Sequence, residues 1–178
     1  MEKSLTIWVE GPDDGRFFDL LNEQIFQDRY GDNSRIIEYS HMTPEEIQRV
    51  IASLEEIGAD YIVVGDVQKC VTNTKSSLKY GRFGQIENRR MVIVVKVIEG
   101  WYLAGLDEKH LKRLKVSWHD NTDAITKEVF NSFIPKKFRT SKVGRRRFMM
   151  EILNCFSLDA AKQRNTSFRY FAEKHLDF

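Results

Sequence analysis

The sequence predicts an α/β protein with a central, mostly parallel sheet that is flanked by helices and extended by further helices at the C-terminus. Strands of the buried type alternate with amphipathic helices in the first half of the chain, which favours parallel pairing with right-handed crossovers. The composition, with 42% hydrophobic and 30% charged residues among 178, is that of a globular protein. We expect an α/β core over residues 1–106 and a helical extension over residues 107–178, packed together as one domain.

The chain begins with a strand, a glycine turn and a helix. Leu5–Val9 is rich in β-branched and aromatic residues, which is typical of a buried strand. Gly11 allows a sharp turn, and an apolar face at helical spacing predicts a helix over Pro12–Asp28. Glu10 then lies at the carboxyl end of a strand, where open α/β sheets place their ligand sites, and Asp14 follows on the first helical turn. The structural alternative is that Glu10 only caps the turn.

Two more strands and one helix follow this opening. Arg35–Tyr39 is a short predicted strand, and Thr43 starts a helix with a capping box that ends near Gly58. Tyr61–Val64 is a continuous apolar run of the kind found in buried parallel strands, and it ends at Gly65-Asp66. The order strand–helix–strand–helix–strand therefore indicates a parallel sheet.

Acidic residues stand at the ends of three predicted strands. They are Glu10, Asp66 and Glu99, the last after Met91–Ile98, the strongest strand pattern in the sequence. Because the carboxyl ends of parallel strands lie on one edge, we expect Glu10 and Asp66 to converge, with Glu99 and Asp14 within reach. Close carboxylates repel one another unless a positive charge lies among them, and hard divalent cations take oxygen ligands. The acids therefore predict a site for Mg²⁺ or Mn²⁺, which activates water and stabilises charge on a phosphoryl group.

Basic residues gather in two segments, although the net charge of the whole chain is only +2. The first, residues 70–90, is predicted to be a mobile loop, in which Tyr80 and Phe83 lie among the bases and are candidates for stacking on nucleobases. The second, residues 135–164, has nine bases and two acids. A solvated face is the simpler interpretation of each, and contact with nucleic-acid phosphates is the alternative. The candidate contacts are Lys75, Lys79, Arg82, Lys136, Lys137, Arg139, Lys142, Arg145 and Arg146.

The strand, Glu10-Gly11 turn and following acid resemble the opening motif of the Toprim (topoisomerase–primase) superfamily. That pattern has a second motif, Asp-x-Asp, after a later strand, where this chain reads Asp66-Val67-Gln68. OLD-type and related stand-alone members follow with a segment similar to Glu-x-Trp-Leu-Leu-Ala, and residues 99–104 read EGWYLA. Residues 158–171 also look like the ending of small Toprim-like proteins of bacteria and archaea. The resemblance therefore covers most of the chain.

The resemblance implies a Rossmann-like Toprim fold and metal-dependent cleavage of phosphodiester bonds in DNA or RNA. By resemblance, Glu10 is the metal-site or general acid–base carboxylate, Asp66 is a metal ligand, and Asp14 and Glu99 are further ligands or supports. Gln68 replaces the second aspartate with a neutral oxygen donor. This leaves open a one-metal nuclease or a module that binds nucleic acid without cleaving it. A third alternative is a subunit acting with an ATPase partner in DNA repair or defence, as in OLD-type systems.

Other features argue against further classes of protein. Cys70 and Cys155 are far apart in the sequence, which predicts a reduced, cytoplasmic protein without a cysteine metal site. The four histidines show no ligand spacing, and there is no phosphate-loop or dinucleotide motif. No apolar run approaches the ~20 residues of a membrane helix, and the N-terminus has no signal-peptide pattern.

Overall fold

The computed structural model describes residues 3–67, 70–117, 119–139, 141 and 143–176. The chain forms two compact units, Met1–Val94 and Val95–Phe178. Residues 95–106, which the sequence assigns to the α/β core, group here with the second unit. The predicted boundary at residue 106 stays a prediction.

The first unit is built on a four-stranded, all-parallel sheet in the order β2-β1-β3-β4, which confirms the predicted fold class. In register, Leu5 lies opposite Ser34 on one side and Asp60 on the other, and Val63 lies opposite Met91. The carboxyl ends of the strands therefore share one edge. The strands are β1 (Leu5–Val9), β2 (Ser34–Glu38), β3 (Asp60–Asp66) and β4 (Met91–Val94).

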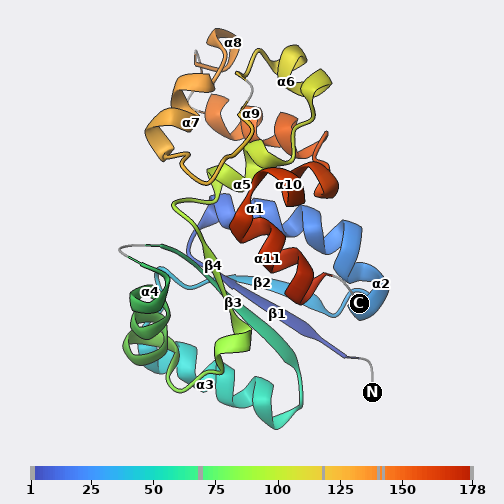
Figure 1. Cartoon of the computed structure of the whole chain (residues 1–178). Coiled ribbons are helices and arrows are strands. Elements are labelled where there is room, and N and C mark those ends of the chain that lie inside the picture. Colours follow the sequence, from blue (N-terminus) through green and yellow to red (C-terminus); the bar gives the residue numbers. More distant parts are fainter. Residues whose placement is uncertain (1–2, 68–69, 118, 140, 142, 177–178) are drawn as a thin grey trace. The chain divides into compact units, whose positions relative to one another are not determined.

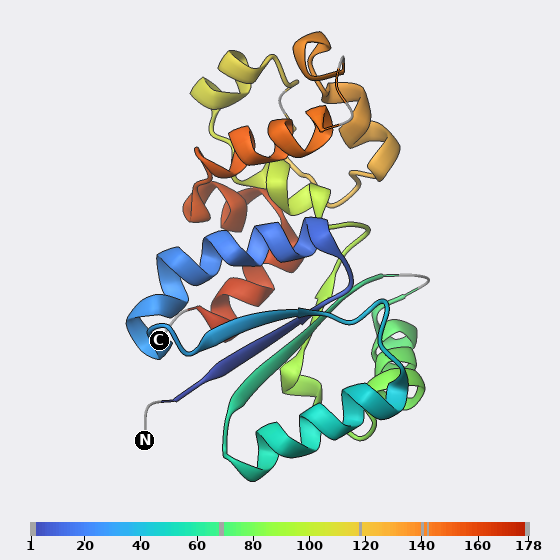
Figure 2. The same ribbon diagram turned by 180° about the vertical axis from the view of Figure 1, so that it is seen from behind.

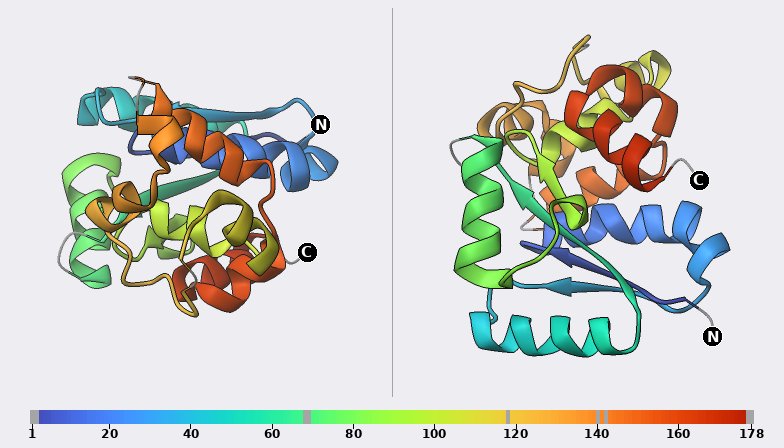
Figure 3. Two further views of the ribbon diagram at one scale, coloured as in Figure 1. Left: turned by 90° about the horizontal axis from the view of Figure 1, so that it is seen from above. Right: turned by 60° about the horizontal axis from the view of Figure 1, so that its bottom comes forward.

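Helices cover both faces of this sheet. Helix α1 lies on one face, and α3 and α4 lie on the other, as the front, rear and tilted views show (Figures 1, 2 and 3). The predicted capping box of α3 is present, since the Thr43 side chain accepts from the amide of Glu46 and the Glu46 carboxylate accepts from the amide of Thr43. The helix predicted to end near Asp28 continues through a π-helical turn to Tyr30. The bounds are α1 (Pro12–Leu21), η1 (Asn22–Phe26), α2 (Gln27–Tyr30) and α3 (Pro44–Glu56).

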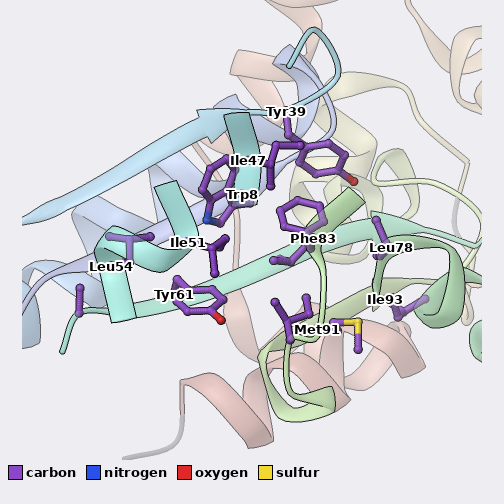
Figure 4. Packing of buried hydrophobic residues seen from close by; sticks show 13 residues of the cluster. Trp8, Tyr39, Ile47, Ile51, Leu54, Tyr61, Leu78, Phe83, Met91 and Ile93 are labelled. Carbon is purple, nitrogen blue, oxygen red and sulfur yellow. The ribbon is translucent and has the colours of Figure 1, made fainter. Parts of the chain in front are cut away.

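The polar segment that follows β3 is helical, so the prediction of a mobile loop over residues 70–90 was wrong. It forms α4 (Val71–Leu78), the π-helix η2 (Lys79–Phe83) and the short 3₁₀ helix η3 (Asn88–Arg90). Buried Leu78 and Phe83 anchor this segment to the core. Phe83 meets the rings of Trp8 and Tyr39 edge-on, with centroids 5.6 and 5.0 Å away, and therefore belongs to the core and cannot stack on bases (Figure 4).

The strand predicted over Met91–Ile98 is shorter in the structure, where β4 ends at Val94. Lys96 has φ +66°, a left-handed backbone conformation that is incompatible with a continuing strand. Glu99 is therefore not a strand-end residue. It is the first residue of helix α5 in the second unit.

The second unit is helical, which confirms the predicted C-terminal helices. Its centre is the fully buried helix α5, where Trp101 stacks on Phe171 and donates to Ser167 Oγ at 2.8 Å. Among the described helices, none combines the length and apolar character needed to cross a membrane. The helices are α5 (Glu99–Ala104), α6 (Glu108–Leu114), α7 (Lys127–Phe133), α8 (Lys136–Arg139), α9 (Gly144–Leu153), α10 (Leu158–Arg164) and α11 (Thr166–His175).

A buried ion pair joins the start of α5 to α9. Glu99 is fully buried, and its Oε1 lies 2.6 Å from Nη2 of Arg145. Arg145 also donates from Nε to Asn131 Oδ1 at 3.1 Å and lies over the ring of Phe130. A charge removed from water in this way stabilises the fold only while its partner is present.

Arg164 secures the other end of α5. Its buried guanidinium donates to the carbonyls of Leu103, Ala104 and Leu106, and also to that of His119. Burial lowers the pKa of Arg164 from its ordinary value. The arginine thus satisfies carbonyls at a helix end that have no partner within the helix.

We predict that Phe83→Ala lowers the free energy of unfolding by about 3–5 kcal/mol, because it opens a cavity in the core of the first unit. Tyr80→Ala is the matched control, since Tyr80 lies in the same π-helix with 74% of its surface exposed. It should change stability by less than about 0.5 kcal/mol. Urea unfolding of both variants measures the difference, and equal losses would contradict the packing of η2 on the sheet.

We predict that Glu99→Gln costs about 2 kcal/mol of stability, because the charge-assisted hydrogen bond between the buried carboxylate and Arg145 is replaced by a weaker one to a neutral amide. Glu108→Gln removes an exposed carboxylate from its pair with Lys112 and should cost less than about 1 kcal/mol. Chemical denaturation distinguishes the two. A negligible cost for Glu99→Gln would show that the pair does not stabilise the second unit.

Candidate functional site

Two of the predicted acids lie in one pocket at the carboxyl edge of the sheet. Glu10 follows β1 and Asp66 is the last residue of β3, and both line a pocket of about 300 Å³. Because Trp8 lies opposite Val63 in the parallel register, the ends of β1 and β3 are nearly level. The pocket therefore contains two carboxylates that come from neighbouring strands.

This pocket lies where the direction of the connections changes. Helix α1, which follows β1, lies on one face of the sheet, and α4, which follows β3, lies on the other, so the chain leaves these two neighbouring strands towards opposite sides (Figure 1). Open α/β sheets bind ligands in the crevice outside the strand ends at such a switch point. The location of the pocket thus follows from the topology of the fold.

Tyr39, which follows β2, crosses the strand ends and forms part of the pocket. Its amide donates to the carbonyl of Val9 and its hydroxyl donates to the carbonyl of Val64, each at 2.9 Å. Burial raises the pKa of Tyr39 above its ordinary value. The negative charges of Glu10, Asp14 and Asp66 raise it further, and Arg82 opposes them. The phenol therefore stays protonated at neutral pH, in a field produced by three carboxylates of the first unit.

Asp14 is a buried acid in the first turn of α1, with 9% of its surface exposed. Its Oδ2 accepts from the amide of Gly11 at 3.3 Å, across the turn that follows Glu10. The side chain thus helps to fix the loop that carries Glu10. The role of Asp14 as a further metal ligand stays a prediction.

One face of α4 and η2 forms the opposite wall of the pocket. Successive turns of this segment line it, and Arg82 Nη1 donates to the carbonyl of Tyr39 at 3.0 Å. The wall therefore brings hydroxyl groups and one guanidinium to a pocket that also holds two acids. The residues of this wall are Thr74, Ser77, Leu78, Gly81 and Arg82.

A divalent ion fits the donor set of the pocket. Among the described residues, no three His, Cys, Asp or Glu side chains form a group that could hold a metal ion. Mg²⁺, however, is commonly held by one or two carboxylates, with water and substrate phosphate completing its shell. Glu10 and Asp66 match that requirement. Glu99 belongs to the second unit, where it pairs with Arg145, and its role toward a metal stays a prediction.

The basic candidates have different surroundings. In the first unit, Arg82 lines the pocket, while Lys75 and Lys79 are not among its lining residues. In the second unit, Arg139 donates to carbonyls at the end of α7, and Arg145 is paired with Glu99. Three others, Lys136, Lys137 and Arg146, are exposed. Lys142 and Gln68, which were also singled out, lie outside the described residues.

Residues of the pocket that were missed from the sequence include Tyr39, Ser40 and Ser77. Tyr39 ends a predicted strand and Ser40 follows it, so both reach the same edge as Glu10, which is the signal that would have identified them. Ser77 gave no such signal, because its segment was taken for a loop.

Comparisons with known proteins support the fold. No family model matches the sequence, and no curated protein matches it either. Among solved structures, the chain is similar to the C-terminal region of the Burkholderia pseudomallei OLD protein, with a TM-score of 0.54 and 12% identity over 97% of this chain and 98% of that one. The resemblance to OLD-type proteins seen in the sequence is thus confirmed at the level of structure: the chain has the fold of the C-terminal region of an OLD protein.

Proposed function

We propose that the protein cleaves phosphodiester bonds of nucleic acid with a divalent metal ion held by Glu10 and Asp66. The observation that carries the proposal is the pocket at the switch point of the sheet, in which these two carboxylates lie beside an arginine. The OLD-like fold supports it. Asp14 supports the site through the turn after Glu10, and a role for Glu99 stays a prediction from the resemblance.

Mg²⁺ or Mn²⁺ bound there would supply an activated water and stabilise charge on the phosphoryl group. The residues of the chain prepare the site for it. Glu10 and Asp66 provide the negative charge that attracts a cation, and Tyr39 fixes the strand ends by bonding to both β1 and β3. Glu10 is exposed, so it can reach a substrate and exchange a proton with it.

Exposed and partly exposed bases provide attraction for a nucleic-acid backbone. Lys75 and Lys79 in the first unit, and Lys136, Lys137 and Arg146 in the second, would neutralise phosphates and make binding weaken with rising salt. An ATPase partner stays a prediction from the resemblance.

A second candidate function is nucleic-acid binding without cleavage. Gln68 stands where the resembled pattern has its second aspartate, and the described residues contain no group of three metal-binding side chains. Wild-type protein that binds oligonucleotides but leaves them intact in Mn²⁺ would favour this candidate.

We predict that Mn²⁺ raises the melting temperature of the wild-type protein and does not raise that of the double variant Glu10→Gln/Asp66→Asn. Mn²⁺ at a concentration 100 times its Kd would stabilise the folded protein by about 2.7 kcal/mol. Without metal, the double variant should be at least as stable as the wild type, because two neighbouring carboxylates no longer repel each other. Differential scanning fluorimetry with Mn²⁺ and with EDTA measures both effects, and an undiminished shift in the double variant would place the metal elsewhere.

We predict that Mn²⁺-dependent cleavage falls at least roughly 100-fold in Glu10→Gln and in Asp66→Asn, as expected for groups that act in proton transfer or hold the metal. The substrates are plasmid, single-stranded DNA and RNA, followed by gel electrophoresis.

The matched control for cleavage is Asp60→Asn, at the amino end of the same strand that Asp66 ends. Asp60 accepts from the hydroxyl of Tyr30 at 3.0 Å, and an asparagine oxygen can accept in its place. This variant should cleave as the wild type does. Wild-type rates in the two pocket variants would show that the activity arises from another site or a contaminant.

A further inference from the structure

Arg82 differs from the other basic residues of its segment in its position and in its contacts. It lines the acidic pocket, where its Nη1 is fixed by the carbonyl of Tyr39 and its guanidinium lies 5.8 Å from the centre of the Tyr39 ring. Within the described part of the chain it forms no ion pair with an acid, although Glu10 and Asp66 line the same pocket. Since a guanidinium has five N–H groups, Arg82 has donors left for a ligand.

Hydroxyl groups complete this side of the pocket. Ser40 follows β2 and Ser77 lies on α4, and both are exposed and line the pocket. No hydrogen bond involves either hydroxyl among the described residues. A fixed arginine with nearby hydroxyl groups is the donor set that binds a phosphate oxygen.

We propose that Arg82, Ser40 and Ser77 form a subsite for one phosphate group of a nucleotide, next to the carboxylates of Glu10 and Asp66. This inference rests on the proposed function and adds a recognition element to it. A pocket of about 300 Å³ is at the small end of ligand sites, so it can hold one nucleotide unit of a chain. The two acids repel an anion, so phosphate binds here together with a divalent ion.

The chain offers variants that test the subsite without disturbing the fold. Gly81 lines the pocket and a Cβ added there would meet no atom within 4 Å, so Gly81→Leu adds a side chain at the pocket wall without a clash at its Cβ. Arg82→Gln removes the charge, and Arg82→Lys keeps it. Arg89→Gln is the control, because it removes an exposed arginine charge of the first unit from outside the pocket lining.

The experiment measures binding of thymidine 5′-monophosphate by calorimetry in Mg²⁺, because this probe has no phosphodiester bond to cleave. We expect binding by the wild type and by Arg89→Gln, and a loss of affinity of about tenfold or more in Arg82→Gln and Gly81→Leu, with part of it restored in Arg82→Lys. Thymidine, which lacks the phosphate, should not bind. Thymidine 5′-(methyl phosphate) carries a phosphate diester, like the phosphates inside a nucleic-acid chain. Tighter binding of this compound than of the monophosphate indicates an internal phosphate as the natural ligand, and weaker binding indicates a terminal one.

The outcome separates the inference from the proposed function. Monophosphate binding that depends on Arg82, in a protein that cleaves no nucleic acid, supports the subsite and refutes cleavage. Cleavage that depends on Glu10, with monophosphate affinity unchanged in both Arg82→Gln and Gly81→Leu, supports cleavage and overturns the subsite. Equal binding of thymidine and its monophosphate also overturns it.

Discussion

The parallel pairing of β1 with both β2 and β3 is the constraint on which the candidate site depends. It brings the carboxyl ends of three strands to one edge, where Glu10, Tyr39 and Asp66 follow or end their strands. Tyr39 holds that arrangement by donating to the carbonyls of Val9 and Val64. A shift of one residue in either pairing would move an acid to the other face of the sheet, so register and chemistry are linked.

Charge is arranged differently in the two units. In the first unit, two carboxylates line an open pocket together with Arg82. In the second, Glu99 is fully buried against Arg145 and contributes to the helical core. Residues of similar type in the sequence therefore line an open pocket in one unit and join the buried core in the other.

The sequence predicted what is encoded locally and missed what depends on distant contacts. The apolar run Tyr61–Val64 and the capping box at Thr43 are local signals, and both elements are present. The polar composition of residues 70–90 hid the anchoring role of Phe83, whose partners Trp8 and Tyr39 lie far away in the chain. Nothing local marks Arg145 as the partner of Glu99, 46 residues away.

The most direct test of the central claim is anomalous diffraction from crystals soaked in Mn²⁺, because it locates the ion without relying on activity. A peak between the carboxylates of Glu10 and Asp66 is the predicted result. A Mn²⁺ peak only at other acids, or none at all while both side chains are ordered, would contradict the account and leave the pocket without a metal centre.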